Sequence, residues 1–267
     1  MSRIGLVAGH GKLPVVFAEA ARAKGDTVIA FGLRGATDED LANHVDKIHW
    51  LEWGEFKKGL LLLAAERVSK IIMLGKIEKD KFFKEESKLD DEAKKLLKSV
   101  KDKKDYAILN GVTKILGTMG MEVINSATYL KDLIPSKGIL TKRGPTAGEK
   151  ADIEYGREVG LALSRFDIGQ TVAIKDRTVI SLEALEGTDE TIERAGLLSG
   201  GDFVVVKVAR PDQDMRLDVP LAGPDTVKAL IKAKGAVLAL EADKTLLLDR
   251  AEVIKLAEEN NISVIII

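Results

Sequence analysis

Acidic and basic side chains are closely spaced in residues 207–226, which read KVARPDQDMRLDVPLAGPDT. Three prolines and one glycine oppose a regular helix there, so we expect an extended loop. Carboxylates bind hard cations such as Mg²⁺, and Lys and Arg side chains neutralise phosphate oxygens. The residue types therefore fit a metal–phosphate site. They fit a charged loop at the protein surface equally well.

A second candidate ligand loop lies near the start of the chain, where Gly9-His10-Gly11 follows an apolar run. A helical pattern begins directly afterwards with Leu13 and Pro14. Glycines at this position let backbone N–H groups approach a phosphate at the start of a helix. The dinucleotide fingerprint is incomplete, because Pro14 replaces the third glycine and residues 31–34 include no acid. An ordinary tight turn is the alternative interpretation.

A third candidate is the segment EGTDE at residues 186–190, which precedes another helical pattern. Thr188 or Asp189 would suit the N-cap of that helix, because a short oxygen-bearing side chain can accept a backbone N–H bond there. The functional alternative is that Gly187, Thr188 and Asp189 hold a ligand at the helix N-terminus.

The hydrophobic pattern indicates an α/β fold with two domains. Strands and helices alternate along the first half, which predicts a Rossmann-like parallel sheet of about five strands. Residues 134–138 (IPSKG) read as a linker, so we expect an N-terminal domain at 1–134 and a C-terminal domain at 135–267. The second domain should be mixed α/β, with hairpins at 171–184 and 236–248. Residues 140–150 are predicted to form a loop before a helix at 151–165.

The composition excludes several classes of function. The chain has 267 residues with 41 Lys+Arg and 42 Asp+Glu, a balance that argues against a nucleic-acid-binding surface. The absence of cysteine excludes disulfides and thiolate chemistry, and the three histidines lack zinc-ligand spacing. No apolar stretch approaches the ~18 residues of a membrane span. We therefore expect a cytoplasmic protein, with peripheral membrane contact left open.

Four segments taken together resemble one family: GLVAGHGKLP, DIGQTV, EGTDETI and KVARPDQDMRLDVPLAGPDTV. In their order and spacing they are similar to the LpxI-type UDP-2,3-diacylglucosamine diphosphatases, over essentially the whole chain. The resemblance implies a bacterial, Mg²⁺-dependent enzyme of lipid A biosynthesis with the ligand between two α/β domains. Its reaction would convert UDP-2,3-diacylglucosamine to UMP and 2,3-diacylglucosamine 1-phosphate (lipid X). Two departures concern the phosphate contacts: Leu221-Ala222-Gly223 replaces Thr-Ile-Gly, and Ala209-Arg210 replaces a lysine before the proline.

The resemblance and the residue types together assign catalytic roles in the loop at 207–226. Asp218 and Asp214 would hold Mg²⁺ or its waters, because residues four apart in an extended segment face one side. Asp218 could instead act as the base that orients water. Lys207, Arg216 and Gln213 would contact the diphosphate.

The remaining ligand contacts would come from the two glycine-containing loops. The first loop would cradle the nucleotide or sugar through Gly9, Gly11, Leu13 and Pro14. The second would hold uridine or phosphate through Gly187, Thr188 and Asp189. Asp212 and Asp225 are expected to have turn and cap roles.

Two other functional classes remain as alternatives. A nucleotide-sugar oxidoreductase would use the loop at residues 9–14 for a dinucleotide. A non-catalytic nucleotide- or lipid-binding module would bind a UDP-sugar without cleaving it. The sequence leaves open contact with the inner membrane and assembly into a homo-oligomer.

Overall fold

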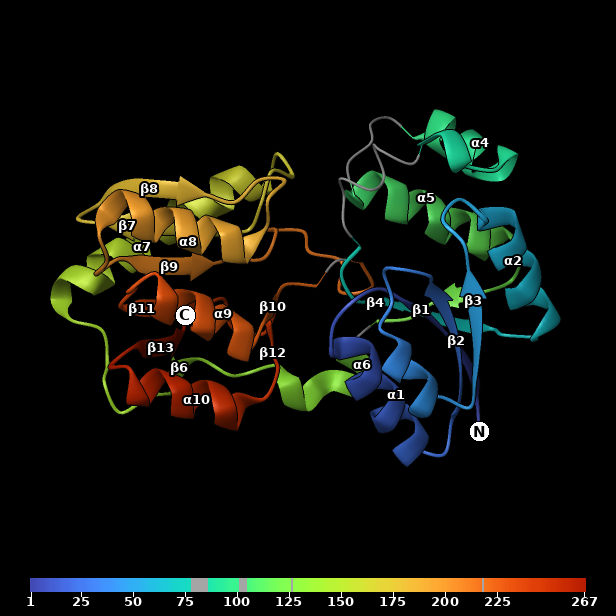
Figure 1. Cartoon of the computed structure of the whole chain (residues 1–267), viewed down its shortest axis with the longest axis horizontal. Helices are drawn as coiled ribbons and strands as arrows, with labels where there is room; N and C mark the ends of the chain where they lie inside the picture. Colours follow the sequence, from blue (N-terminus) through green and yellow to red (C-terminus); the bar gives the residue numbers. More distant parts are fainter. Residues whose placement is uncertain (78–85, 101–104, 126, 218) are drawn as a thin grey trace. The chain divides into compact units, whose positions relative to one another are not determined.

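The computed structural model of the chain describes residues 1–77, 86–100, 105–125, 127–217 and 219–267 (Figure 1). It forms two compact units, one of Met1–Leu130 with Asp214–Asp218 and one of Lys131–Gln213 with Val219–Ile267. We call them the N-terminal and the C-terminal unit. The predicted domain boundary lies after residue 134, whereas the units divide between Leu130 and Lys131. The grouping of Asp214–Asp218 with the N-terminal unit was not predicted.

The N-terminal unit contains the predicted parallel sheet. Its five strands have the order β3-β2-β1-β4-β5, and all neighbours run parallel. The strands are β1 (Arg3–Ala8), β2 (Thr27–Leu33), β3 (Lys47–Leu51), β4 (Lys70–Leu74) and β5 (Glu122–Val123). The strand order reverses direction between β1 and β4, and open α/β sheets bind ligands outside the carboxyl ends of their strands at such a point.

Helices of the N-terminal unit pack on this sheet. The α-helices are α1 (Leu13–Ala23), α2 (Phe56–Ala65), α4 (Asp91–Ser99), α5 (Asp105–Thr118) and α6 (Ala127–Leu130), and the 3-10 helices are η1 (Glu39–Asn43) and η2 (Glu86–Lys88). Leu63 of α2 and Leu116 of α5 share a core with Ile29, Phe31 and Ile71 of the strands. The charge-rich stretch of residues 76–105 lies partly outside the described residues.

The C-terminal unit contains a mixed sheet of six strands with the order β6-β13-β11-β9-β7-β8. Strands β9, β11 and β13 are parallel, whereas β6, β7 and β8 pair antiparallel with their neighbours. The strands are β6 (Gly138–Ile139), β7 (Thr171–Lys175), β8 (Thr178–Leu182), β9 (Val204–Lys207), β11 (Val237–Leu240) and β13 (Ser263–Ile266). The hairpin predicted at residues 171–184 is therefore confirmed as β7 and β8.

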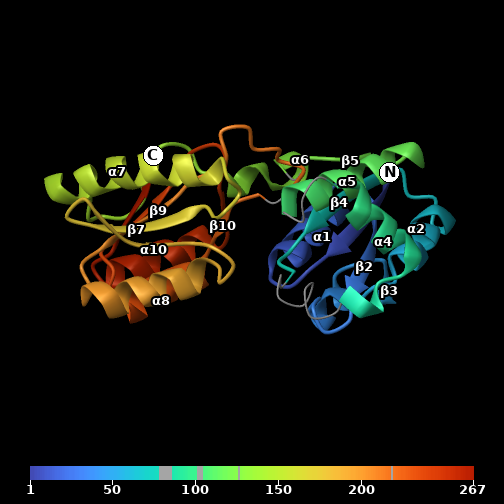
Figure 2. The ribbon, with the colours of Figure 1, turned by 90° about the horizontal axis from the view of Figure 1, so that it is seen from above.

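Helices cover both faces of this sheet, with α7 on one side and α8 and α10 on the other (Figure 2). The helices are η3 (Lys131–Leu133), α7 (Ala147–Ser164), α8 (Thr188–Ser199), α9 (Pro224–Lys232) and α10 (Arg250–Glu259). Val204 and Val206 of β9 join the core beneath α7, and Phe203 and Val205 join the core on the α8 side. Because side chains alternate along a strand, Lys207 lies on the α8 side.

Two predictions of secondary structure are wrong. Helix α7 begins at Ala147, because Thr146 and Glu149 form a capping box in which the Glu149 N–H donates to Thr146 Oγ1 (3.2 Å) and the Thr146 N–H donates to Glu149 Oε2 (2.7 Å). The predicted loop at 140–150 is correspondingly shorter. The predicted hairpin at 236–248 does not form, because β12 (Leu246–Leu247) pairs in parallel with β10 (Leu221–Ala222).

Candidate functional site

The glycine loop after β1 lies against the segment that follows β4. The Gly9 N–H donates to the Leu74 carbonyl (2.8 Å), and His10 and Lys76 exchange two backbone hydrogen bonds of 2.8 and 2.9 Å. A Cβ atom on Gly9 would lie 2.6 Å from the Lys76 carbonyl oxygen. This close approach of two backbones requires glycine at position 9.

The N–H group at the start of α1 already has an anionic partner. Gly11 has a φ of 104°, and its N–H donates to Oδ2 of Asp38 at 2.7 Å. The other oxygen of Asp38 lies 2.8 Å from Nδ1 of His10. A carboxylate of the chain therefore occupies the place where a phosphate would approach the helix N-terminus.

Leu13 and Pro14 are buried in the first turn of α1. Their side chains pack inside the unit, so a ligand contact at these two positions would have to come from the backbone. Their predicted contact with a nucleotide or sugar stays a prediction.

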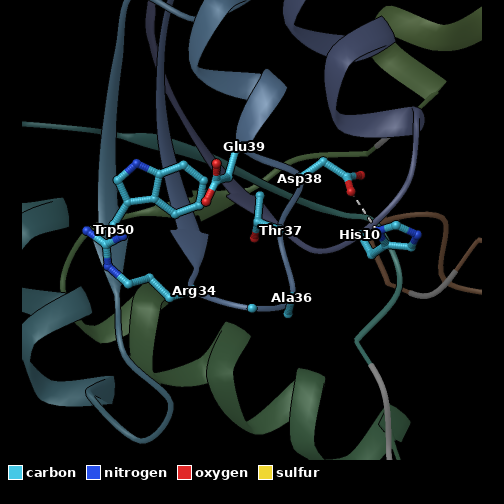
Figure 3. Close-up of a pocket in the computed structure, with 8 residues that line it drawn as sticks. His10, Arg34, Ala36, Thr37, Asp38, Glu39 and Trp50 are labelled. Atoms are coloured by element: carbon cyan, nitrogen blue, oxygen red, sulfur yellow. Dashed lines mark ion pairs between the residues drawn. The ribbon is translucent and has the colours of Figure 1, made fainter.

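An open pocket of about 480 Å³ lies beside this loop, at the carboxyl ends of β1 and β2 (Figure 3). Its lining residues are His10, Arg34, Gly35, Ala36, Thr37, Asp38, Glu39 and Trp50. Figure 3 shows Trp50 and Arg34 together at one side and the His10–Asp38 ion pair at the other. All these residues belong to the N-terminal unit.

In the C-terminal unit, Lys207 is buried at the carboxyl end of β9, with 6% of its surface exposed. Its ammonium group donates to Oγ1 of Thr188 at 2.7 Å and to Oγ1 of Thr171 at 3.3 Å. Thr171 lies opposite Lys207 in the antiparallel pairing of β7 and β9. The sheet and the first residue of α8 thus fix one buried cation.

Glu183 provides the negative charge near Lys207. Its Oε1 accepts the Thr188 hydroxyl hydrogen bond (2.9 Å), and its Oε2 accepts from the Gln170 N–H (3.1 Å). Burial opposes ionisation of this carboxyl group, but the charge of Lys207 and these hydrogen bonds outweigh it and hold the pKa of Glu183 below its ordinary value. The buried Lys207 and the partly buried Glu183 are therefore oppositely charged neighbours linked through the Thr188 hydroxyl group.

The start of α8 differs from the predicted cap. Gly187 is the N-cap residue, with a φ of 95° and no side-chain cap, so the prediction of Thr188 or Asp189 as the cap is wrong. The Thr188 hydroxyl is engaged by Glu183 and Lys207 instead. The carbonyl oxygen of Gly187 accepts the Thr191 hydroxyl at 2.7 Å, and Asp189 is exposed in the first turn.

The predicted catalytic loop is divided between the units. Lys207 and Gln213 belong to the C-terminal unit, and Asp214 and Arg216 to the N-terminal unit. Gln213 closes a turn with Arg210, whose N–H donates to Gln213 Oε1 at 3.3 Å and whose carbonyl accepts from the Gln213 N–H at 3.1 Å. Asp218, the predicted metal ligand or base, lies outside the described residues.

Asp214 and Arg216 form an ion pair with each other. Arg216 Nε donates to Oδ1 of Asp214 at 2.9 Å and Arg216 Nη2 donates to Oδ2 at 2.6 Å. These hydrogen bonds hold the pKa of Asp214 below its ordinary value. The Leu217 N–H donates to the Asp214 carbonyl (2.9 Å), so the segment turns here. The prediction of an extended segment is therefore wrong for residues 214–217.

The described residues contain no cluster of three or more His, Asp or Glu side chains suited to a metal ion. Both carboxylate oxygens of Asp214 already contact the Arg216 guanidinium. The described geometry therefore does not fit a preformed Mg²⁺ site at Asp214.

Comparison with protein families gives two matches along the chain. The LpxI N-terminal domain matches residues 3–133, and the LpxI C-terminal domain matches residues 136–265. The chain belongs to the LpxI family. A relative within this family is the UDP-2,3-diacylglucosamine pyrophosphatase LpxI of Caulobacter vibrioides, which is 29% identical over 272 residues. That alignment covers 97% of this chain and 95% of the relative.

Solved structures give much weaker likenesses. A biotin carboxylase–β-γ-ATP complex from Campylobacter jejuni is 12% identical, covering 73% of this chain and 42% of that one, with a TM-score of 0.23. An N5-carboxyaminoimidazole synthetase from Staphylococcus aureus complexed with ADP is 14% identical, covering 74% and 63%, with a TM-score of 0.25. This LpxI-family chain spans less than two thirds of either, and likenesses this low carry no argument.

The sequence did not single out several residues that the structure brings together. Glu183 and Thr171 meet Lys207 only through strand pairing and the start of α8, which single-sequence patterns do not reveal. Asp38 reaches the glycine loop from beyond β2, so an acid does contact this loop although residues 31–34 contain none. The segment DIGQTV, one of the four segments that resemble the LpxI family, includes Thr171 and was the sequence signal that could have pointed to this residue.

Within the described part of the chain, no helix has the length and apolarity to cross a bilayer.

Proposed function

We propose that this protein hydrolyses the diphosphate of UDP-2,3-diacylglucosamine in lipid A biosynthesis. The observation that carries the proposal is the match to both LpxI domains, together with the near full-length alignment to a UDP-2,3-diacylglucosamine pyrophosphatase. Water would add across the P–O–P bridge, with a hydroxyl group joining one phosphorus and the bridging oxygen leaving on the other. The products would be UMP and 2,3-diacylglucosamine 1-phosphate (lipid X).

We assign the binding of one phosphate group to Lys207 and the start of α8. A buried ammonium group interacts more strongly with a phosphate than an exposed one, because less water screens the charge. The helix N-terminus adds backbone N–H groups and the positive end of the helix dipole. Glu183 would orient Lys207 through Thr188. This arrangement supports charge neutralisation of a diphosphate, which its hydrolysis requires.

We further propose that the reaction depends on Mg²⁺, with Asp218 and Asp214 as ligands. Bound Mg²⁺ would neutralise phosphate charge and lower the pKa of a coordinated water. Because Asp214 pairs with Arg216 in the described geometry, its carboxylate would have to exchange that partner for the metal. Arg216 would then contact the diphosphate. We propose that Gln213 contacts the diphosphate as well.

The test is an assay of the full chain with UDP-2,3-diacylglucosamine and Mg²⁺, with and without a chelator, following UMP. We expect chelator-sensitive release of UMP. If substrate binds but no UMP forms in excess Mg²⁺, the protein is a binding module and the proposed hydrolysis is wrong. UMP release that persists in chelator would retain the hydrolase and remove the metal. A nicotinamide absorbance change would indicate the oxidoreductase alternative.

We expect Asp218→Ala to lower the rate about a hundredfold or more if Asp218 positions metal or water. Asp212→Ala, a change of the same residue type in the same loop, is the matched control and should retain the rate. Turnover of Asp218→Ala at the wild-type rate would remove this residue from the mechanism.

We also propose that the enzyme works at the cytoplasmic surface of the inner membrane, because its substrate carries two acyl chains. Co-sedimentation with phospholipid vesicles that contain the substrate, but not with vesicles that lack it, would support contact through the substrate. Binding to neither would contradict membrane contact.

A further inference from the structure

The pocket beside the glycine loop has a composition that fits one part of the proposed substrate. Its volume of about 480 Å³ lies within the range usual for small-molecule sites. It also lies at the carboxyl ends of parallel strands, where open α/β sheets bind ligands. The proposed hydrolysis gives its lining residues no role.

One side of the pocket is a flat aromatic and cationic surface. Trp50 is half-buried, and a Cβ atom on Gly32 would lie 2.9 Å from its ring, so the indole packs directly on the backbone of β2. The Arg34 guanidinium lies 5.7 Å from the ring centroid, and Arg34 Nε lies 3.3 Å from Oε1 of Glu52. Aromatic rings and guanidinium planes are surfaces on which nucleobases stack.

Thr37 fixes the loop that joins the Trp50–Arg34 side of the pocket to the side formed by Asp38. The Thr37 hydroxyl donates to the Ala8 carbonyl at 2.6 Å and accepts from the Leu33 N–H at 2.8 Å. The side chain of Thr37 is thus occupied by the backbones of β1 and β2. It connects the two sides of the pocket and does not itself select a ligand.

The other side of the pocket is acidic. A carboxylate offers about four acceptor positions. Asp38 uses one oxygen for the Gly11 N–H and one for His10, which leaves an acceptor position on each oxygen. Its side chain is 42% exposed, and Glu39 lines the same pocket. Such a wall repels a diphosphate and accepts hydrogen bonds from hydroxyl groups, as acids in dinucleotide-binding folds do from ribose.

We propose that this pocket binds the nucleoside of the substrate, with the base against Trp50 and Arg34 and the ribose hydroxyls on Asp38 and Glu39. The assignment rests on the proposed function for the identity of the nucleoside, uridine. It predicts that the N-terminal unit recognises base and ribose.

The first test measures binding of UMP and ribose 5-phosphate to the full chain by calorimetry. Trp50→Leu should weaken UMP binding about 10- to 100-fold, because stacking of a base on an aromatic ring is lost. Binding of ribose 5-phosphate, which has no base, should be unchanged. Trp53→Leu is the matched control and should bind both ligands as the wild type does.

The second test addresses the ribose. The wild type should bind UMP about tenfold more tightly than 2′-deoxy-UMP, because a hydroxyl–carboxylate hydrogen bond is lost. Asp38→Asn should reduce this discrimination, whereas Asp40→Asn in the 3-10 helix η1, which directly follows Asp38, should retain it. Asp40 contacts Asn43 and His44 and does not line the pocket.

The outcomes separate this inference from the proposed function. If Trp50→Leu binds UMP like the wild type, or loses UMP and ribose 5-phosphate in equal proportion, the nucleoside site is wrong. Retained discrimination in Asp38→Asn would contradict the ribose contact. If either of these negative binding results is found and the wild type still hydrolyses UDP-2,3-diacylglucosamine, the proposed function stands without the nucleoside site. If the variants lose UMP binding as predicted but the wild type does not hydrolyse UDP-2,3-diacylglucosamine, the nucleoside site is supported and the proposed hydrolysis is wrong.

Discussion

A glycine with positive φ precedes each of the helices α1 and α8, Gly11 two residues before Leu13 and Gly187 directly before Thr188, but the polar contacts at the two helix starts differ. The Gly11 N–H at the start of α1 is bonded to the carboxylate of Asp38. At the start of α8, the ammonium group of Lys207 contacts the Thr188 hydroxyl, and Gly187 provides no side-chain cap. The two helix starts therefore differ in the charged residue that a distant part of the chain brings to them, Asp38 at α1 and Lys207 at α8.

This difference argues against treating both glycine loops as phosphate cradles. A helix N-terminus attracts anions, and at α1 the chain supplies its own. At α8 the buried cation strengthens the attraction for an external anion. We therefore expect the two loops to respond differently to substitution.

The largest effect should come from Lys207→Met, which removes the cation at α8. We expect kcat for UDP-2,3-diacylglucosamine to fall about 100- to 1,000-fold, as for loss of one preorganised charge-stabilising group. Lys175→Met is the matched control. Lys175 lies in the same sheet, but its ammonium group donates to the carbonyls of Ser199 and Gly201.

Loss of Lys207 also leaves Glu183 buried without its cation, which could unfold the protein. The double variant Lys207→Met/Glu183→Gln removes both charges and should recover thermal stability without recovering activity. Recovery of both would mean that Lys207 is structural and that α8 is no phosphate site.

The next-largest effect concerns stability and tests the close backbone contact between the loop before α1 and the segment after β4. Gly9→Ala should lower the free energy of unfolding by about 2–3 kcal/mol, because the new Cβ would meet the Lys76 carbonyl oxygen. Gly117→Ala in α5 has open space around the added Cβ and should be neutral or stabilising by ~0.5–1 kcal/mol. Chemical denaturation measures both. Equal stability of the two variants would contradict the close contact between the loops.

Glu183→Gln should have a smaller effect on activity, because it removes a charge and keeps the side-chain shape. We expect kcat to fall about tenfold as Lys207 loses its orienting charge. Glu186→Gln, which breaks an ion pair with Arg194 nearby, should retain activity. Unchanged kcat in Glu183→Gln would show that Lys207 needs no anionic partner.

The same variant has a stability signature in acid. Because the folded pKa of Glu183 lies below its unfolded value, its contribution to stability is present above about pH 4.3 and is lost as pH falls through the folded pKa. The difference in stability between the wild type and Glu183→Gln should therefore shrink below about pH 4. A constant difference would contradict the stabilisation of the Glu183 carboxylate by Lys207 and its hydrogen bonds.

The smallest effect concerns alkaline stability of the N-terminal unit. Burial, with a 2.7 Å hydrogen bond to Asp26, raises the pKa of Tyr129 to about 12. A raised folded pKa contributes stability below the unfolded pKa of about 10 and loses it as pH rises through the folded value. The wild type should therefore lose stability between about pH 10 and 12, and Tyr129→Phe should lack this part of the decline. An identical alkaline decline in both proteins, followed by circular dichroism, would contradict the assignment.

Much of the fold could be predicted because each parallel strand is a short apolar run between turn residues. The N-terminal unit has the parallel sheet of about five strands that the alternation of strands and helices in the sequence indicates. The start of α7 differs from the prediction because Thr146 and Glu149, inside the predicted loop at 140–150, form a capping box that begins the helix. The hairpin at 236–248 was wrong because VLAL at 237–240 forms a fully buried strand between two parallel neighbours.

The candidate sites were harder to predict, because their contacts join residues that are distant in sequence. Lys207 was predicted from its residue type, but Thr171 and Glu183 reach it through β-strand pairing and the start of α8. Asp38 was not predicted because it lies beyond residues 31–34, the end of β2 where the dinucleotide fingerprint places its ribose-binding acid. Asp214 and Arg216 were expected to serve metal and phosphate, and the turn at 214–217 pairs them with each other instead.

The position of β13 has a consequence for how the C-terminal unit folds. Residues 138–139 of β6 pair only with β13, at Ile265 and Ile266, and β13 separates β6 from the rest of the sheet. The unit's first strand in sequence is therefore held in the sheet by its last strand. Closing so long a loop costs chain entropy before the contacts form, and pairings of high sequence separation slow folding. We therefore expect the pairing of β6 with β13 to form slowly compared with the β7–β8 hairpin.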